Sequence, residues 1–409
     1  MSLCRYLPTP SDRMAVLWSL ISIEDVIVLE YGPGGTTNYS RSRLLDSIGL
    51  KPENKNNLFT THMREDDVVM GNASRLENAI VELDEVYHPK VIFVLASYIT
   101  AVIGTDIQGI CHYMQDRVSA QLIPVDTGSF KGDYTVGLRE IYKLIAQEIP
   151  LPDPKKTQAC NILGTSAGSY RIRSDIRELE DLLHKAFGIR MGAVLGSDSN
   201  LFAIEQMGGA ALNLVLRAEA LPCAEVLKNR FGTPLVYGSP YGYKGTLQWL
   251  KMVGSNLGKE ADSALESALQ VKAQNAVQLC RVAMMSKEHP AATVVGDYDL
   301  INGISTFLED LGMKIAHKIC NHSLRDIHEH DETIVQYNKE AEQLALLKEL
   351  RGQLVFGDDI TCNVIPQDST GVCVSAPFIR RRQLATHMPI MGECGADWLL
   401  EKIYKYLES

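Results

Sequence analysis

Short apolar segments alternate with longer amphipathic segments along most of the chain. The apolar segments are rich in Val, Ile and Leu, and they end in or near Gly, Ser, Thr or Asp. Strands with this continuous apolar character are buried on both faces of a sheet, and helices connect them. The pattern therefore predicts an α/β fold made of doubly wound, Rossmann-like parallel-sheet units.

The predicted strands fall into three groups of four. The first group holds 26–32, 58–61, 91–97 and 121–127, the second 159–164, 190–195, 211–216 and 234–238, and the third 292–296, 313–319, 353–356 and 371–375. Helical periodicity predicts helices that include 73–86, 106–118, 174–187, 220–231, 299–311 and 398–407. We therefore expect three Rossmann-like units in one chain.

Two joints separate the three groups of strands. Residues 149–154 are rich in proline, which makes a stiff linker. Residues 255–283 are polar and alanine-rich, with the periodicity of one long connecting helix. We expect a first unit over 1–152, a second over 153–283 and a third over 284–409.

Composition narrows the classes of function. The chain has 409 residues and a formal net charge of −10, which argues against binding to nucleic acid. No apolar stretch is long enough to cross a bilayer, and the first residues lack the apolar core of a signal peptide. The nine cysteines form no CxxC pair, as is typical of a reducing compartment. We therefore expect a cytoplasmic protein that contacts neither nucleic acid nor membrane.

The strongest local signal is a glycine-rich loop directly after the first predicted strand. It reads Tyr-Gly-Pro-Gly-Gly-Thr-Thr-Asn-Tyr-Ser over 31–40. Its glycines permit a tight turn and a close approach of the backbone to a ligand or partner. A plain strand-to-helix turn explains the same residues equally well. No GxxxxGK[ST] or GxGxxG motif is present, so we expect no ATP or dinucleotide bound by this chain itself.

Other candidate motifs are weaker. The segment 125–132 enters a helix through Gly and Ser, and its amides could hold an anion, although a structural role is more common. Residues 164–168 depart by one position from the GxSxG motif of hydrolases. Four histidines at 317–330 surround Cys320, but their spacing matches no known zinc pattern. We interpret this histidine-rich segment as a solvated loop.

Five motifs, taken in order along the chain, resemble the nitrogenase component 1 superfamily. The five motifs lie at residues 31–36, 60–71, 102–106, 127–132 and 389–396. In that order, they are similar to the family patterns His-Gly-Pro-x-Gly-Cys, Thr-Thr-x-x-x-Glu-x-Asp-x-Val-x-Gly, Val-Ile-Gly-x-Asp, Thr-x-x-Phe-x-Gly and Pro-x-x-Gly-x-x-Gly-Ala. This superfamily includes nitrogenase subunits, a cofactor-assembly scaffold and several nitrogenase-like reductases. The resemblance covers nearly the whole chain and implies the same three-unit fold.

The resemblance also implies a candidate cluster site. Family members with a full site use three cysteines per subunit, and this chain has Cys4, Thr36 and Tyr98 at the matching positions. Because an iron–sulfur cluster takes four ligands, Cys4 and three thiolates of a partner subunit would complete a shared cluster such as [4Fe–4S]. A homodimer would supply only two thiolates. An oxygen ligand from Thr36 or Tyr98 is a minor alternative, and Cys4 could also be a frayed terminal residue that ligates nothing.

The glycines of the loop complete this candidate site. Gly32, Gly34 and Gly35 would form a wall beside the cluster, because a cluster edge leaves no room for a Cβ. The separate metallocluster of nitrogenase is held by a Cys and a His of the α subunit, and the Cys position falls near Leu216 here, where we find no match. The resemblance therefore implies a β-type subunit that does not hold this metallocluster.

The function implied is a subunit of an ATP-dependent two-component reductase. Its partners would be a homologous α-type subunit, together forming a hetero-oligomer such as a heterotetramer, and a P-loop iron–sulfur reductase. ATP would act only through that reductase, which would pass electrons through the shared cluster to a substrate site. Two alternatives stay open at this point: a scaffold for assembling a nitrogenase-type metallocofactor, and a cluster-free structural partner.

Overall fold

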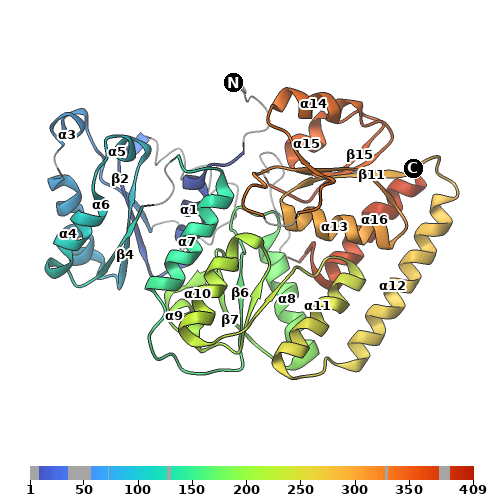
Figure 1. Ribbon diagram of the computed structural model, residues 1–409, viewed down its shortest axis with the longest axis horizontal. Coiled ribbons are helices and arrows are strands. Elements are labelled where there is room, and N and C mark those ends of the chain that lie inside the picture. Colours follow the sequence, from blue (N-terminus) through green and yellow to red (C-terminus); the bar gives the residue numbers. More distant parts are fainter. Residues whose placement is uncertain (1–8, 36–56, 72, 127–129, 328–329, 377–386) are drawn as a thin grey trace.

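A computed structural model gives the fold (Figure 1), and it describes residues 9–35, 57–71, 73–126, 130–327, 330–376 and 387–409. Three parallel sheets follow one another along the chain. Figure 1 shows the first sheet at one end of the molecule, the second in the middle and the third against the second. The fold class predicted from the sequence is confirmed.

The first sheet has four parallel strands, in an order that reverses direction between β2 and β4. The order is β3 (Leu58–Thr60), β2 (Ile27–Tyr31), β4 (Val91–Ala96) and β5 (Gln121–Val125). Its helices are α1 (Asp12–Ile21), α3 (Glu65–Met70), α4 (Ser74–Tyr87), α5 (Tyr98–Val102), α6 (Ile107–Met114) and α7 (Tyr134–Glu148), with a 3-10 helix at Gln115–Arg117. The buried strand residues explain why the apolar runs of the sequence are continuous.

The second sheet repeats this strand order. It runs β10 (Leu235–Tyr237), β9 (Leu212–Val215), β6 (Cys160–Leu163) and β7 (Met191–Leu195). Its helices are α8 (Ile172–Phe187), α9 (Leu201–Glu205), α10 (Leu221–Phe231) and α11 (Gly242–Leu257), with 3-10 helices at Met207–Gly209 and Ala218–Ala220. A two-stranded ladder of β1 (Ile23–Glu24) and β8 (Ser199–Asn200) joins the first two units.

The third sheet has five parallel strands. Its order is β13 (Ile334–Gln336), β12 (Lys314–Cys320), β11 (Ala291–Gly296), β14 (Leu354–Gly357) and β15 (Thr370–Cys373). Its helices are α13 (Tyr298–Asp310), α14 (Glu340–Glu349) and α15 (Asp359–Val364). Two further helices, α12 (Ser263–Met284) and α16 (Gly392–Glu408), pack on each other and on α11 (Figure 1).

The structure corrects one predicted element. The segment 255–283 is not one helix, because α11 ends at Leu257 and α12 begins only at Ser263. Gly258 has a φ of +63°, a left-handed conformation that ends helices and favours glycine. Asp262 then caps α12 by accepting a hydrogen bond from the Leu265 amide. The unit boundaries at 152 and 283 stay predictions.

The apolar cores cross between the three units. Buried residues of α1 and α7 pack in one cluster with β6, β7 and α10, which joins the first unit to the second. A second cluster contains residues of α8, α11, α13 and α16, which joins the second unit to the third. None of the described helices is long and apolar enough to span a membrane. The joined cores hold the carboxyl ends of the second and third sheets against one another.

Candidate functional site

The described part of the glycine-rich loop, residues 31–35, follows β2 at the switch point of the first sheet, where β2 lies beside β4. Ligands of doubly wound sheets bind at this position. A Cβ on Gly32 would lie 2.4 Å from the Ser97 Cβ, so only glycine fits there. The Gly32 amide donates to Thr61 Oγ1 over 3.1 Å, and Thr60 Oγ1 donates to the Gly32 carbonyl over 2.9 Å. Neighbouring strand ends therefore hold the loop in place.

Gly34 and Gly35 have different surroundings. A Cβ on Gly34 would lie 2.4 Å from His62 Nδ1, whereas a Cβ on Gly35 would meet no described atom within 4 Å. The contact that requires glycine at 32 comes from this chain's own Ser97, whereas the contact at 34 is with the exposed side chain of His62. No described side chain occupies the position beside Gly35, and a cluster edge there stays a prediction.

Tyr98 begins α5 and is tied to the start of α1. Its hydroxyl lies 2.7 Å from the Oγ of Ser11, which caps α1. Its ring lies 4.8 Å from the Phe130 ring between centroids, and the Arg13 guanidinium lies 5.1 Å from the Tyr98 ring centroid. Tyr98 therefore lies next to the Gly32–Ser97 contact, and the Tyr98 hydroxyl is hydrogen-bonded to the Ser11 hydroxyl.

A buried ion pair lies next to Tyr98. Arg13 of α1 pairs with Glu30 of β2, and the two side chains are 3% and 0% exposed. The adjacent Asp12 is also buried and accepts a hydrogen bond from the Lys131 amide over 2.8 Å. We did not predict these residues, although a glutamate inside the apolar run 26–32 was a visible signal. Charges buried this deeply persist only when they are paired.

Two of the predicted site residues, Cys4 and Thr36, lie outside the described residues. The eight described cysteines lie in other elements: α6, β6, α10, α12, β12, α15, β15 and α16. Within the part of the chain that the structure describes, no group of three His, Cys, Asp or Glu side chains could hold a metal ion. Cys4 thus stays the candidate thiolate ligand of this chain.

Exposed apolar side chains gather near the glycine-rich loop. Val69 and Met70 at the end of α3 are 81% and 79% exposed, and Ile103 after α5 is also exposed. These three residues and Tyr113 of α6 line one shallow hollow. We call these four residues the α3–α6 surface. Exposed apolar groups that cluster in this way mark sites of protein interaction.

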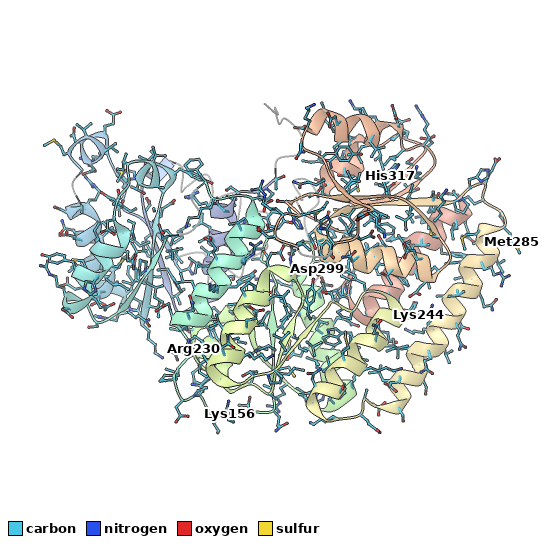
Figure 2. All side chains as sticks on the ribbon, in the orientation of Figure 1. Lys156, Arg230, Lys244, Met285, Asp299 and His317 are labelled. Atoms are coloured by element: carbon cyan, nitrogen blue, oxygen red, sulfur yellow. The ribbon has the colours of Figure 1, made fainter. Side chains whose placement is uncertain are left out.

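A second candidate site, which we call the junction cavity, lies where the second and third sheets meet. Its volume is about 430 Å³. Loops after β6, β9, β11 and β14 contribute Gly164, Arg217, Asp297 and Asp358 to its lining. These four strands flank the switch points of the two sheets, where ligands of such folds bind. Figure 2 shows Asp299, another lining residue, between the two units.

An ion-pair network built on Arg217 closes one wall of the junction cavity. Arg217 donates to both carboxylate oxygens of Glu219 over 3.1 Å and to Asp297 Oδ2 over 3.2 Å. Burial would raise the pKa of Glu219, but the Arg217 charge lowers it to about 2. Burial would lower the pKa of Arg217, but Asp297 and Glu219 raise it. Arg217 and Glu219 are therefore both ionised at neutral pH.

The histidine-rich segment is not a solvated loop throughout, because His317 lies in β12 and His322 is only 2% exposed. The Nε2 of His322 accepts a hydrogen bond from the Tyr298 amide over 3.1 Å, so its Nδ1 donates to the Ser323 carbonyl over 3.0 Å. Both ring nitrogens are thus used within the protein. His330 lies beside the Ile327 carbonyl, and His328 lies outside the described residues.

Two buried carboxyl groups should make the fold less stable as the pH rises. Burial raises the pKa of Asp175 and of Asp299 to about 7, from a model-compound value of 3.8. Between about pH 4 and pH 7 the folded chain then binds more protons than the unfolded chain, so the free energy of unfolding falls with rising pH.

Asp175→Asn keeps an oxygen for the Ile390 and Met391 amides. We expect it to flatten this slope by about half in urea titrations, and an unchanged slope would contradict the assignment.

Comparison with known proteins places the chain in a family. Residues 11–408 match the family described as nitrogenase component 1 type oxidoreductases. The chain belongs to this family. The predicted resemblance is therefore confirmed over nearly the whole chain, and the three sheets are those of a nitrogenase component 1 type protein.

Individual relatives and structures agree with this family. The nitrogenase iron-molybdenum cofactor biosynthesis protein NifE of Klebsiella pneumoniae is 28% identical over 313 residues, which cover 73% of this chain and 67% of that protein. NifE of Clostridium pasteurianum is 30% identical over 301 residues, covering 71% and 64%. The chain thus spans about two thirds of the length of these relatives. A solved structure of nitrogenase Cp1 at pH 6.5 shares the fold, with a TM-score of 0.79 at 16% identity over 100% of this chain and 94% of that chain.

The junction cavity of this nitrogenase component 1 type protein lacks the expected metallocluster ligand. Leu216 and Arg217 follow β9, where the resemblance places a cysteine. Both residues line the cavity, and Arg217 is already paired with Glu219 and Asp297. The position where the resemblance would place a cysteine therefore holds Leu216, next to the paired guanidinium of Arg217.

Proposed function

We propose that this chain is the β-type subunit of a nitrogenase-like reductase and shares an iron–sulfur cluster with a homologous α-type subunit. A P-loop iron–sulfur reductase would deliver electrons to that cluster in steps driven by ATP. The observation that carries the proposal is the α3–α6 surface, an exposed apolar surface near the glycine-rich loop. An exposed apolar surface of this kind is typical of a subunit that a partner covers.

The residues present fit a shared cluster in part. Cys4 would supply one thiolate, and three would come from the partner subunit. No described atom lies within 4 Å of a Cβ on Gly35, which is compatible with a cluster edge there, and the buried Arg13–Glu30 pair lies beside Tyr98. A bound cluster supplies one-electron transfer. This chain's own contribution is to position the loop, exclude water and present the surface to its partners.

The α3–α6 surface should be needed for assembly. Met70 is 79% exposed, and burying a side chain of this size contributes about 1.5–3 kcal/mol. Met70→Asp should therefore weaken binding of the partner subunit or of the reductase by about tenfold or more. Sedimentation of the co-expressed assembly measures the contact with the partner subunit. Electron transfer from the reductase measures the contact with the reductase.

The matched control is Val271→Asp. Val271 is 55% exposed and lies on α12, far from the glycine-rich loop (Figure 1). We expect Val271→Asp to leave both contacts unchanged. If Met70→Asp also leaves both unchanged, the α3–α6 surface is not an interface of the assembly.

A scaffold for metallocofactor assembly is the second candidate, because the relatives named above are NifE cofactor biosynthesis proteins. Arg217 argues against it, since a scaffold must hold its cargo and the junction cavity has no thiolate after β9. An anaerobic pulse of ⁵⁵Fe distinguishes a reductase subunit from a scaffold. A reductase subunit retains its labelled cluster through many turnovers. A scaffold passes the label to an acceptor protein, and that result would replace the proposal.

A further inference from the structure

The segment that follows β3 is fastened to the glycine-rich loop at Gly32. The Met63 amide and Thr60 Oγ1 both donate to the Gly32 carbonyl over 2.9 Å. The Gly32 amide donates to Thr61 Oγ1 over 3.1 Å, and both Thr61 and Met63 are buried. His62 is the exposed residue between these two buried anchors. Its position relative to the loop is therefore fixed from both sides.

The backbone of His62 is left-handed, and its imidazole lies on Gly34. The φ of His62 is +56°, which is uncommon for a residue other than glycine and persists where the surrounding structure imposes it. A Cβ on Gly34 would lie 2.4 Å from His62 Nδ1 and 2.9 Å from His62 Cε1. The ring therefore occupies space that exists because residue 34 is glycine.

The nitrogens of this imidazole are not used within the described part of the chain. The backbone amide of His62 donates to Thr60 Oγ1 over 3.4 Å. Among the residues that the structure describes, no group is hydrogen-bonded to either ring nitrogen. His322 differs, because both of its ring nitrogens are used. An imidazole carries at least one N–H, so His62 has a donor to offer at the loop.

This donor lies one residue away from the open position of the loop. No described atom lies within 4 Å of a Cβ on Gly35, and a cluster edge is compatible with that position. Reduction adds negative charge to an iron–sulfur cluster, so an N–H group that donates to its sulfurs stabilises the reduced form. Such hydrogen bonds are among the features that set cluster potentials. His62 thus presents a tuning group where the proposed function needs one.

We propose that the His62 imidazole donates a hydrogen bond to the shared cluster and thereby raises its reduction potential. The inference rests on the proposed function, because it assigns a role at the same site. His62 would tune the cluster without ligating it, since Cys4 and three thiolates of the partner subunit complete the four ligands. The imidazole keeps its proton in this role, so no proton transfer and no further reactant is needed.

The reduction potential of the anaerobically purified assembly, measured by a redox titration, tests the proposal. His62→Phe keeps a ring but has no N–H to donate, and it should shift the potential to a more negative value at unchanged iron content. His62→Asn and His62→Gln place an amide N–H near the positions of Nδ1 and Nε2, and at least one should restore most of the wild-type potential. A purely structural role would not depend on an N–H group in this way.

The matched control is His88→Phe. His88 is also exposed and left-handed, with a φ of +45°. It caps the end of α4, just before the amino end of β4, whereas the glycine-rich loop lies at the carboxyl end of the same sheet. We expect His88→Phe to leave both the potential and the iron content unchanged.

Three results would overturn the inference and leave the proposed function standing. One is a wild-type potential in His62→Phe with full iron, and another is an equal shift in His88→Phe. The third is a loss of iron in His62→Phe and His62→Gln alike, because the imidazole would then hold the cluster and not tune it. A wild-type assembly that contains no iron would instead overturn the proposed function, and this inference with it.

Discussion

Glu30→Ala is expected to destabilise the chain by about 3–5 kcal/mol, because it leaves the Arg13 guanidinium buried without its carboxylate. The two side chains are 3% and 0% exposed, so water cannot replace the lost partner. A loss of this size is a large share of the stability of a typical protein. Urea-induced unfolding, followed by circular dichroism, measures the change.

Two controls separate charge burial from loss of contacts. The double variant Arg13→Met, Glu30→Leu removes both charges and should recover most of the loss, since well-packed apolar residues replace buried ion pairs at little cost. Glu342→Ala breaks an exposed pair with Lys339 and should change the free energy of unfolding by less than about 1 kcal/mol. If Glu30→Ala costs no more than Glu342→Ala, the Arg13–Glu30 pair does not stabilise this site.

Cys4→Ala is expected to remove most of the iron from the anaerobically purified assembly. A shared cluster needs four ligands, and Cys4 is the thiolate that this chain would contribute. Colorimetric iron and acid-labile sulfide, together with the cluster's absorbance spectrum, measure the loss. The reduction potential of any remaining cluster should also change, because its ligand set would be altered.

Other cysteines serve as controls for Cys4. Cys394 lies at the exposed start of α16 and Cys280 is buried in α12. Cys394→Ala and Cys280→Ala should leave the iron content unchanged. Full iron and an unaltered spectrum in Cys4→Ala would show that this chain ligates no cluster and is a cluster-free partner.

The strands were the most predictable part of this fold. A run such as 91–97 is apolar at consecutive positions because β4 is buried on both faces of its sheet, and the same holds for β2 and β14. Helix ends were harder to place. The α11–α12 break depends on Gly258 adopting a positive φ, and the helical periodicity on both sides of this residue concealed the break.

Short and edge elements escaped prediction for a physical reason. β13 has three residues, two of them exposed, so it has no continuous apolar pattern. The β1–β8 ladder has two pairs of residues from distant parts of the chain. Such elements are stabilised by the neighbours that they meet in the fold, and a local pattern does not record those neighbours.

The candidate site was predictable only through the family resemblance. Local turn chemistry could not decide between a plain turn and a ligand loop at Gly32, and the structure adds that Ser97 forces the glycine there. The Arg13–Glu30 pair and the Arg217–Asp297 pair join residues that are far apart in sequence. The junction cavity therefore became visible only when the two sheets were placed against each other.

The central claim is that this subunit holds part of a cluster that a P-loop reductase reduces. The most direct test is stopped-flow spectroscopy of the anaerobic assembly, mixed with the reduced P-loop partner with and without MgATP. The proposed function predicts a cluster bleach that requires MgATP, is complete in the wild type and is absent in Cys4→Ala. A wild-type assembly whose spectrum does not change on mixing, although its iron content is full, would contradict it.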